Sequence, residues 1–189
     1  MECMMDKLDL FSTPIWSTKL DLDTVALSSD IKAFADKTKC ESVSNIGGYQ
    51  GNHYENDLLR DSILSQMPRR RDRPIKSYDM AMWANINGPG HRNKRHHHCH
   101  TNTFLSGVYY VSVPPESGNI RFYDPRGGVL LGMADGEYFE YIGEHVYVDV
   151  VDNQLLFFPS WLEHDVETNM SQYDRISVAF NITIEYGDH

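Results

Sequence analysis

The second half of the chain is a series of short apolar segments separated by turn residues, and this pattern limits the fold more than any other feature. The expected strands cover residues 78–86, 105–113, 119–123, 138–142, 146–150, 154–158, 164–167 and 175–185. Short strands at this spacing are typical of antiparallel sandwiches and barrels. A parallel sheet is not expected, because it needs a long crossover, usually a helix, between successive strands. The sequence therefore predicts a jelly-roll-like β core.

Two amphipathic helices are expected before this core. Residues 24–39 carry apolar side chains at helical spacing, with Asp23 or Thr24 as the N-cap. Residues 57–66 show the same spacing, and Asn56 can cap them.

The length of the chain is suited to one domain. A chain of 189 residues can bury about 70% of its unfolded surface in a single core. We expect a mainly β (α+β) domain over residues 1–189, with a helical part at about 20–68 and the β core at about 78–186.

Three other segments have a recognisable character. Residues 10–16 are typical of a short edge strand, since an edge tolerates their proline. Residues 44–51 contain three glycines, and this turn-rich segment is interpreted as a candidate lid. Residues 69–76 have a local charge of +5 − 1 = +4, for which a solvated linker is favoured over an anion-binding role.

The charge and the cysteines narrow the choice of partners and compartment. The formal charge of −10 disfavours a nonspecific grip on phosphate backbones, so nucleic acid is not an expected partner. The sequence has neither the run of about 20 apolar residues needed to span a membrane nor a secretion signal. Three irregularly spaced cysteines favour a reducing compartment, the cytoplasm. The oligomeric state, including a homo-oligomer, is left open.

The strongest chemical signal is a histidine cluster at residues 96–100. His98 and His100 are two residues apart, so on a strand both side chains would project from the same face, as a chelating pair requires. His164, presented where an apolar strand turns, is the expected third ligand. Such a set leaves coordination positions open, as non-haem Fe(II) chemistry needs. Zinc, or adventitious metal bound by a histidine-rich tract, are the alternatives.

A second feature favours iron with 2-oxoglutarate. Arg175 lies eleven residues after His164 and shares a strand face with Ser177, so a guanidinium and a hydroxyl could hold a carboxylate together. The alternative is that Arg175 is a rim residue with an ion-pair partner at the surface.

These motifs resemble the Fe(II)/2-oxoglutarate-dependent dioxygenases, and more narrowly the 2-oxoglutarate-Fe(II) oxygenases of marine bacteria and their phages. The resemblance implies a double-stranded β-helix, or jelly-roll, with iron held by a His-x-Asp or His-x-Glu pair and a distal histidine. It rests on residues 10–16, 44–50, 83–85, 98–102, 106–111, 117–120, 124–126, 158–164 and 175–181.

The resemblance assigns the metal ligands with one departure. His98 matches the first ligand and His164 the distal one, while His100 stands where the superfamily usually has a carboxylate. Three neutral imidazoles would then rely on the 2-oxoglutarate dianion to offset the metal charge. Asp124 could supply a carboxylate instead, although capping its own turn is the favoured role.

The resemblance also assigns the cosubstrate site. Arg175 and Ser177 match the 2-oxoglutarate anchor, and Tyr109 is the expected second contact of the carboxylate. Asn85 is a candidate hydrogen-bond partner of the cosubstrate or of a ligand imidazole, with local bonding to the backbone as the alternative.

The sequence thus predicts an Fe(II)- and 2-oxoglutarate-dependent oxygenase that uses O2 to hydroxylate an unidentified primary substrate, with release of succinate and CO2. If a phage encodes it, the host cytoplasm is the expected location. Two alternatives stay open. One is a cupin-like three-histidine metalloenzyme that does not use 2-oxoglutarate, and the other is a non-enzymatic jelly-roll binding or virion module.

Overall fold

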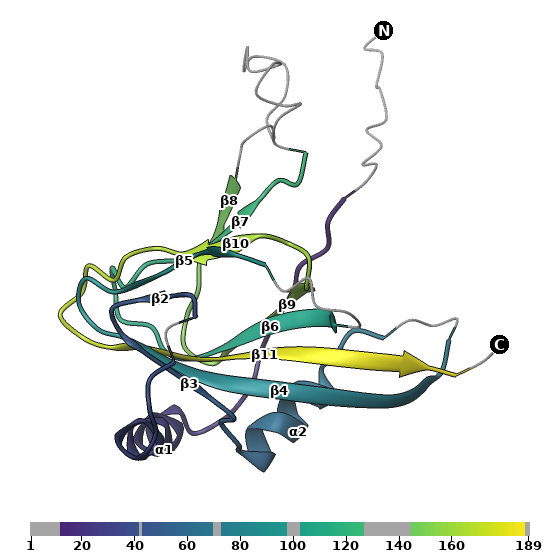
Figure 1. Cartoon of the computed structure of the whole chain (residues 1–189), viewed down its shortest axis with the longest axis horizontal. Helices are drawn as coiled ribbons and strands as arrows, with labels where there is room; N and C mark the ends of the chain where they lie inside the picture. Colours follow the sequence, from purple (N-terminus) through teal and green to yellow (C-terminus); the bar gives the residue numbers. More distant parts are fainter. Residues whose placement is uncertain (1–11, 42, 70–72, 98–102, 127–144, 188–189) are drawn as a thin grey trace, which may run out of the picture.

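The two expected helices are present with the expected caps (Figure 1). The computed structural model describes residues 12–41, 43–69, 73–97, 103–126 and 145–187. Helix α1 spans Thr24–Lys37, and the Asp23 side chain accepts hydrogen bonds from the first turn. Helix α2 spans Asp57–Ser65, and Asn56 accepts a hydrogen bond of 3.0 Å from the backbone N–H of Leu59.

Eleven strands are formed by the described residues. They are β1 Trp16–Lys19, β2 Asn45–Ile46, β3 Tyr49–Asn52, β4 Ile75–Asn87, β5 Arg92–His96, β6 Thr103–Ser112, β7 Ile120–Tyr123, β8 His145–Val148, β9 Gln154–Pro159, β10 His164–Val166 and β11 Arg175–Tyr186. The expected strand at 138–142 lies outside the described residues, as do residues 70–72 of the basic run.

The strands form two antiparallel sheets that face each other (Figure 1). The major sheet has the order β1-β9-β6-β11-β4-β3, and the minor sheet has the order β2-β5-β10-β7-β8. From β4 to β7, and again from β8 to β11, the chain passes from one sheet to the other with each strand. The predicted jelly-roll core is therefore confirmed.

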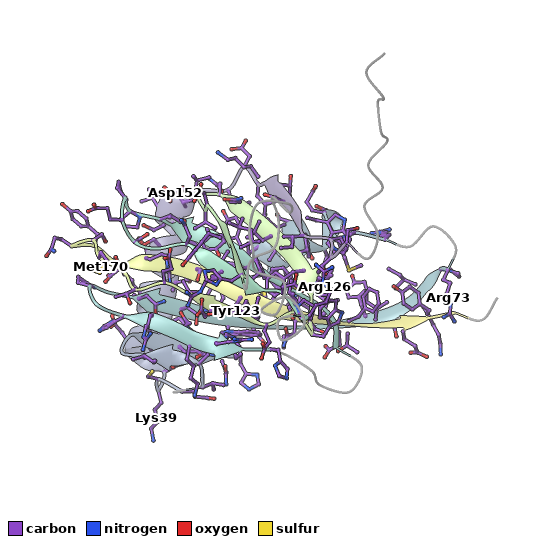
Figure 2. The ribbon with its side chains drawn as sticks, turned by 90° about the horizontal axis from the view of Figure 1, so that it is seen from above. Lys39, Arg73, Tyr123, Arg126, Asp152 and Met170 are labelled. Atoms are coloured by element: carbon purple, nitrogen blue, oxygen red, sulfur yellow. The ribbon has the colours of Figure 1, made fainter. Side chains whose placement is uncertain are left out.

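Both faces of the major sheet are buried. One face packs against α1 and α2 around Ile31, Leu59, Phe157 and Phe180, whereas the other faces the minor sheet across a smaller apolar cluster. Strands β4 and β11 are the longest, and Met170 and Arg73 mark opposite ends of this pair in Figure 2. No helix in the described ranges is both long and apolar enough to cross a bilayer.

Two segments differ from expectation. The glycine-rich segment is a tight connection between the sheets, because β2 pairs with β5 of the minor sheet and β3 pairs with β4 of the major sheet. Gly47 and Gly48 have φ values of 69° and 62°, which allow this tight turn. The edge strand expected at 10–16 begins instead at Trp16 and pairs with β9.

Candidate active site

The candidate site is a cavity between the two sheets. Because side chains alternate along a strand, every second residue at the start of β11 faces this cavity, and Arg175, Ser177 and Ala179 all line it. The polar or aromatic residues that line the rest of it include Trp83, Asn85, Asn93, His96, Ser106, Tyr110 and His164. The shared face expected for Arg175 and Ser177 is thus part of one cavity wall.

Arg175 is a buried cation held by backbone carbonyls. Arg175 is 3% exposed, and its Nη1 donates hydrogen bonds of 3.1 Å to the carbonyl oxygens of Ser117 and Gly118. No carboxylate of the described residues lies within 4.0 Å of the guanidinium, so it is not a rim residue with an ion-pair partner there. Burial lowers the pKa of Arg175, but an arginine stays protonated at physiological pH. This end of the cavity therefore favours an anion.

The tyrosine beside Arg175 is Tyr110, not Tyr109. Tyr109 lies on the helix-facing side of β6, where its hydroxyl donates to Oδ1 of Asn153. Tyr110 points between the sheets, is 2% exposed, and its hydroxyl has no hydrogen-bond partner among the described residues. Burial raises the pKa of Tyr110, which keeps the hydroxyl protonated as a neutral donor. Tyr109 therefore does not face the cavity, contrary to the expectation from the sequence, and Tyr110 lines it instead.

Asparagines form the side wall of the cavity. Asn85 lies on β4 rather than in a loop, is 7% exposed, and its buried Oδ1 has no hydrogen-bond partner among the described residues. Next to it, Asn87 Nδ2 donates to Asn93 Oδ1 at 2.7 Å, and Asn93 Nδ2 donates to Ser44 Oγ at 3.3 Å. Asn93 is bonded through both its oxygen and its nitrogen, whereas Oδ1 of Asn87, like Oδ1 of Asn85, has no hydrogen-bond partner among the described residues.

His164 is the first residue of β10 and is 4% exposed. Its Nδ1 lies 2.8 Å from the carbonyl oxygen of Leu162. Because a carbonyl can only accept, Nδ1 carries the hydrogen and the neutral ring keeps its lone pair on Nε2. This is the tautomer that a metal-binding histidine with an oriented ring adopts.

His96, which belongs to the histidine cluster but was not one of the three expected ligands, lies beside His164. The two residues are opposite each other in the β5–β10 register, and their ring centroids are 4.4 Å apart. Nδ1 of His96 is 2.7 Å from the carbonyl oxygen of Lys94, so this ring has the same tautomer. Burial lowers the pKa of His96, which keeps the ring neutral near pH 7. A charged, polar strand such as β5 gave no hydrophobic pattern that could have located this histidine.

The two remaining expected ligands, His98 and His100, lie outside the described residues. Strand β5 ends at His96, two residues before His98. Within the described ranges, no group of three His, Cys, Asp or Glu side chains is arranged to hold a metal ion.

The carboxylates near this end of the minor sheet are already engaged. Asp124 accepts a hydrogen bond of 2.8 Å from the backbone N–H of Arg126 and also pairs with its guanidinium, which matches the favoured turn-capping role. Asp165 is bound by Arg121 and by the Tyr123 hydroxyl, and Tyr123 and Arg126 are labelled in Figure 2. Burial alone would raise the pKa of Asp165, but these hydrogen bonds outweigh burial and hold it below its usual range.

Comparison with solved structures shows the same fold in several enzymes. A prolyl-4-hydroxylase from Pseudomonas putida has 16% sequence identity, covers 92% of this chain and 94% of its own, and gives a TM-score of 0.59. HygX from Streptomyces hygroscopicus, with nickel and 2-oxoglutarate bound, has 11% identity, coverage of 90% and 82%, and a TM-score of 0.62. A prolyl hydroxylase from Trichoplax adhaerens, in complex with a hypoxia inducible factor peptide fragment, has 14% identity, coverage of 89% and 83%, and a TM-score of 0.59.

Comparison with curated proteins gives no match. A family model does match residues 81–181, more than half of the 189 residues, and this range includes the cavity-lining parts of β4, β5, β6, β7, β10 and β11. The Fe(II) and 2-oxoglutarate expected from the sequence are the metal and cosubstrate of that family. The chain belongs to the family described as "Putative 2OG-Fe(II) oxygenase".

Proposed function

We propose that this oxygenase is a hydroxylase of a still unidentified substrate, and that Arg175 and Ser177 anchor the distal carboxylate of 2-oxoglutarate. Tyr110 donates a further hydrogen bond to the same carboxylate. Asn85 contacts the cosubstrate from the side wall. Fe(II) is held by His98, His100 and His164, with O2 as the oxidant.

The observation that carries this proposal is the buried guanidinium of Arg175, which has no ion-pair partner within 4.0 Å among the described residues, although the charge of Glu167 acts on it from farther away. A buried charge without a direct ion-pair partner costs roughly several kcal/mol, even after relaxation of its surroundings. The cost is offset when a carboxylate enters and accepts the N–H groups that the Ser117 and Gly118 carbonyls do not use. A cupin-like enzyme that does not use 2-oxoglutarate would need no such cation in its cavity.

The described part of the metal site fits a divalent iron. His164 presents its ring from a strand end, and the hydrogen bond from its Nδ1 to the carbonyl oxygen of Leu162 fixes the ring plane. Three neutral ligands carry no charge, so the 2-oxoglutarate dianion supplies the compensation. Bound Fe(II) would supply the activation of O2, with conversion of 2-oxoglutarate to succinate and CO2.

The test of the anchor is the variant Arg175→Met, which removes the charge at a similar length. We expect the KM for 2-oxoglutarate to rise about 30-fold or more, which corresponds to about 2 to 4 kcal/mol for a buried charge pair that loses one partner. Arg60→Met on α2 is the matched control, because α2 packs on the opposite face of the major sheet. An unchanged KM in Arg175→Met would refute the anchor.

The metal ligands are tested by alanine variants of His98, His100, His164 and, because of its position, His96. We expect His164→Ala to abolish succinate formation in the absence of a primary substrate. Undiminished turnover in that variant would contradict its role as a ligand.

Hydroxylation is tested by turnover in ¹⁸O2 with any compound that stimulates succinate formation. We expect one labelled oxygen atom in the product and the other in succinate. An oxidised but unlabelled product would indicate a different oxidation and would exclude the hydroxylase proposal.

The cytoplasm, of a host cell if a phage encodes the chain, is the proposed location. The support for it is the odd number of cysteines, three, without regular spacing. Cys40, the cysteine among the described residues, is a free thiol. Fractionation of cells that express the protein would test this location.

A further inference from the structure

The loop between β6 and β7 is held by a hydrogen bond within the loop and by others to the segment after β10. The backbone N–H of Ser117 donates to the carbonyl of Pro114 at 3.1 Å, and Met170 donates to the carbonyl of Glu116 at 2.9 Å. Asn119 and Glu167 are joined by two hydrogen bonds of 3.0 Å, one of them to the Glu167 carboxylate. The loop is therefore fixed to the segment that follows β10.

This loop holds Arg175 through its backbone. The carbonyl oxygens of Ser117 and Gly118 both accept from Nη1, each at 3.1 Å. The guanidinium is planar, so fixing one nitrogen by two carbonyls restricts the direction of its other N–H groups. The position of two peptide oxygens thus determines how Arg175 faces the cavity.

The position of these carbonyls depends on Gly118. Its φ of +86° is a conformation that residues with a side chain rarely adopt. A Cβ atom at Gly118 would lie 2.9 Å from both the Cβ and the carbonyl oxygen of Glu167. Because the second of these is backbone, it cannot rotate away, and alanine would have to displace the loop and its carbonyls.

We propose that Gly118, through the Ser117–Gly118 carbonyls, is the positioning residue that makes the site selective for a 2-oxoacid with a distal carboxylate. This inference rests on the proposed role of Arg175. Neither Ser117 nor Gly118 lines the cavity, so the effect of the loop passes through the orientation of the guanidinium.

The proposal predicts a selective loss of affinity. In Gly118→Ala, the affinity for 2-oxoglutarate falls about 10- to 100-fold, the range expected when a binding group is misplaced by about 1 Å. The affinity for 2-oxovalerate is unchanged, because this acid has the same five carbons but no distal carboxylate. Both are measured by calorimetry on the Mn(II)-loaded protein without oxygen, so the readout does not depend on turnover.

A matched control distinguishes the two effects of Gly118→Ala, which are the displacement of the loop by a collision and the backbone strain at a positive φ. Gly90 has a similar φ of +79°, but no atom lies within 4 Å of a Cβ built there. Gly90→Ala therefore introduces the same backbone strain without a collision. We expect it to keep the wild-type preference for 2-oxoglutarate.

A second pair of variants addresses the loop if Gly118→Ala does not fold. Glu167→Ala removes the acceptor of the Asn119 N–H, whereas Glu167→Gln keeps an oxygen there but removes the charge. We expect Glu167→Ala to lose part of the selectivity and Glu167→Gln to retain it. An equal loss in both would assign the effect to the charge of Glu167 and overturn the geometric inference.

The outcomes distinguish this inference from the proposed function. If Arg175→Met leaves the preference for 2-oxoglutarate unchanged, the anchor itself is wrong. If Arg175→Met abolishes the preference but Gly118→Ala preserves it, the anchor stands and the positioning role of Gly118 is refuted. Equal weakening of both acids in Gly118→Ala would also refute it, since that result indicates general damage.

Discussion

Substitutions of the two neighbouring tyrosines of β6, Tyr109 and Tyr110, allow effects on stability to be distinguished from effects on cosubstrate binding. Tyr110 places a hydroxyl in the cavity that has no hydrogen-bond partner among the described residues, whereas the Tyr109 hydroxyl is bonded to Asn153 on the helix side of the sheet. Tyr110→Phe therefore removes a hydroxyl without a partner in the described part of the chain, and Tyr109→Phe removes one that has a partner. The two variants are expected to have opposite effects.

The magnitudes follow from the cost of unpaired polar groups. A buried hydroxyl without a partner costs about 1 to 3 kcal/mol, so Tyr110→Phe is expected to unfold at a higher temperature than the wild type. A gain of about 1 kcal/mol raises Tm by about 2 to 4 °C in a chain of this size. The same change removes the proposed hydrogen bond to the 2-oxoglutarate carboxylate, worth about 1.5 to 3 kcal/mol, and is expected to lower the affinity for 2-oxoglutarate about 10- to 150-fold.

Tyr109→Phe is the internal control. Its lost hydrogen bond costs about 0.5 to 1.5 kcal/mol of stability, because Asn153 Oδ1 keeps a second contact of 3.3 Å with the Leu22 N–H. Its affinity for 2-oxoglutarate is expected to equal that of the wild type. Calorimetric unfolding and anaerobic titration with 2-oxoglutarate measure both quantities on the same samples. The reasoning fails if Tyr110→Phe is less stable and binds 2-oxoglutarate normally, or if Tyr109→Phe loses that affinity.

Two further predictions concern stability alone. The pKa of Asp165 is lower in the folded protein than the value of about 4 expected in the unfolded chain. The ion pair of Asp165 with Arg121 therefore contributes its full stabilisation above about pH 4, and this contribution is lost as the pH falls through the lower pKa of the folded state. In urea titrations, Asp165→Asn is therefore expected to be less stable at pH 7 and to lose less stability on acidification; an unchanged acid response would contradict this. Asn153 has a φ of 63°, so Asn153→Gly is expected to be about 1 kcal/mol more stable to unfolding than Asn153→Ala. Both variants lose the hydrogen bonds of the side chain, but only alanine adds backbone strain. Equal unfolding midpoints of the two variants would refute this.

Local signals located the helices and most of the strands. Asp23 and Asn56 accept hydrogen bonds from the first turns of α1 and α2, because a side-chain oxygen there satisfies an N–H that has no partner within the helix. Neither β5 nor the short strands β2 and β3 were expected. The sequence of β5 is charged and polar, and β2 and β3 are held at the edges of the two sheets by pairing rather than by an apolar pattern.

The choice between Tyr109 and Tyr110 could not be made from the sequence. In a sheet with one wet face, polar residues show which side chains point outward. The major sheet is buried on both faces, so Tyr109 and Val111 face the helices while Val108 and Tyr110 face the minor sheet, and all four are apolar or aromatic. Only the register of the sheet decides which tyrosine reaches the cavity. For Arg175 and Ser177, by contrast, the spacing of two along one strand was sufficient to put both on one face.

The polar groups of the cavity also restrict the chemistry of what binds there. Native proteins pair almost all buried polar groups, so groups without a partner indicate a ligand. Arg175 can only donate hydrogen bonds, and the Tyr110 hydroxyl, protonated because its pKa is raised, is the donor beside it. The ligand at this end must therefore accept at least two hydrogen bonds and carry negative charge. A carboxylate meets both conditions, whereas an amine or an uncharged alcohol does not, which supports the proposal that the distal carboxylate of 2-oxoglutarate binds at this position.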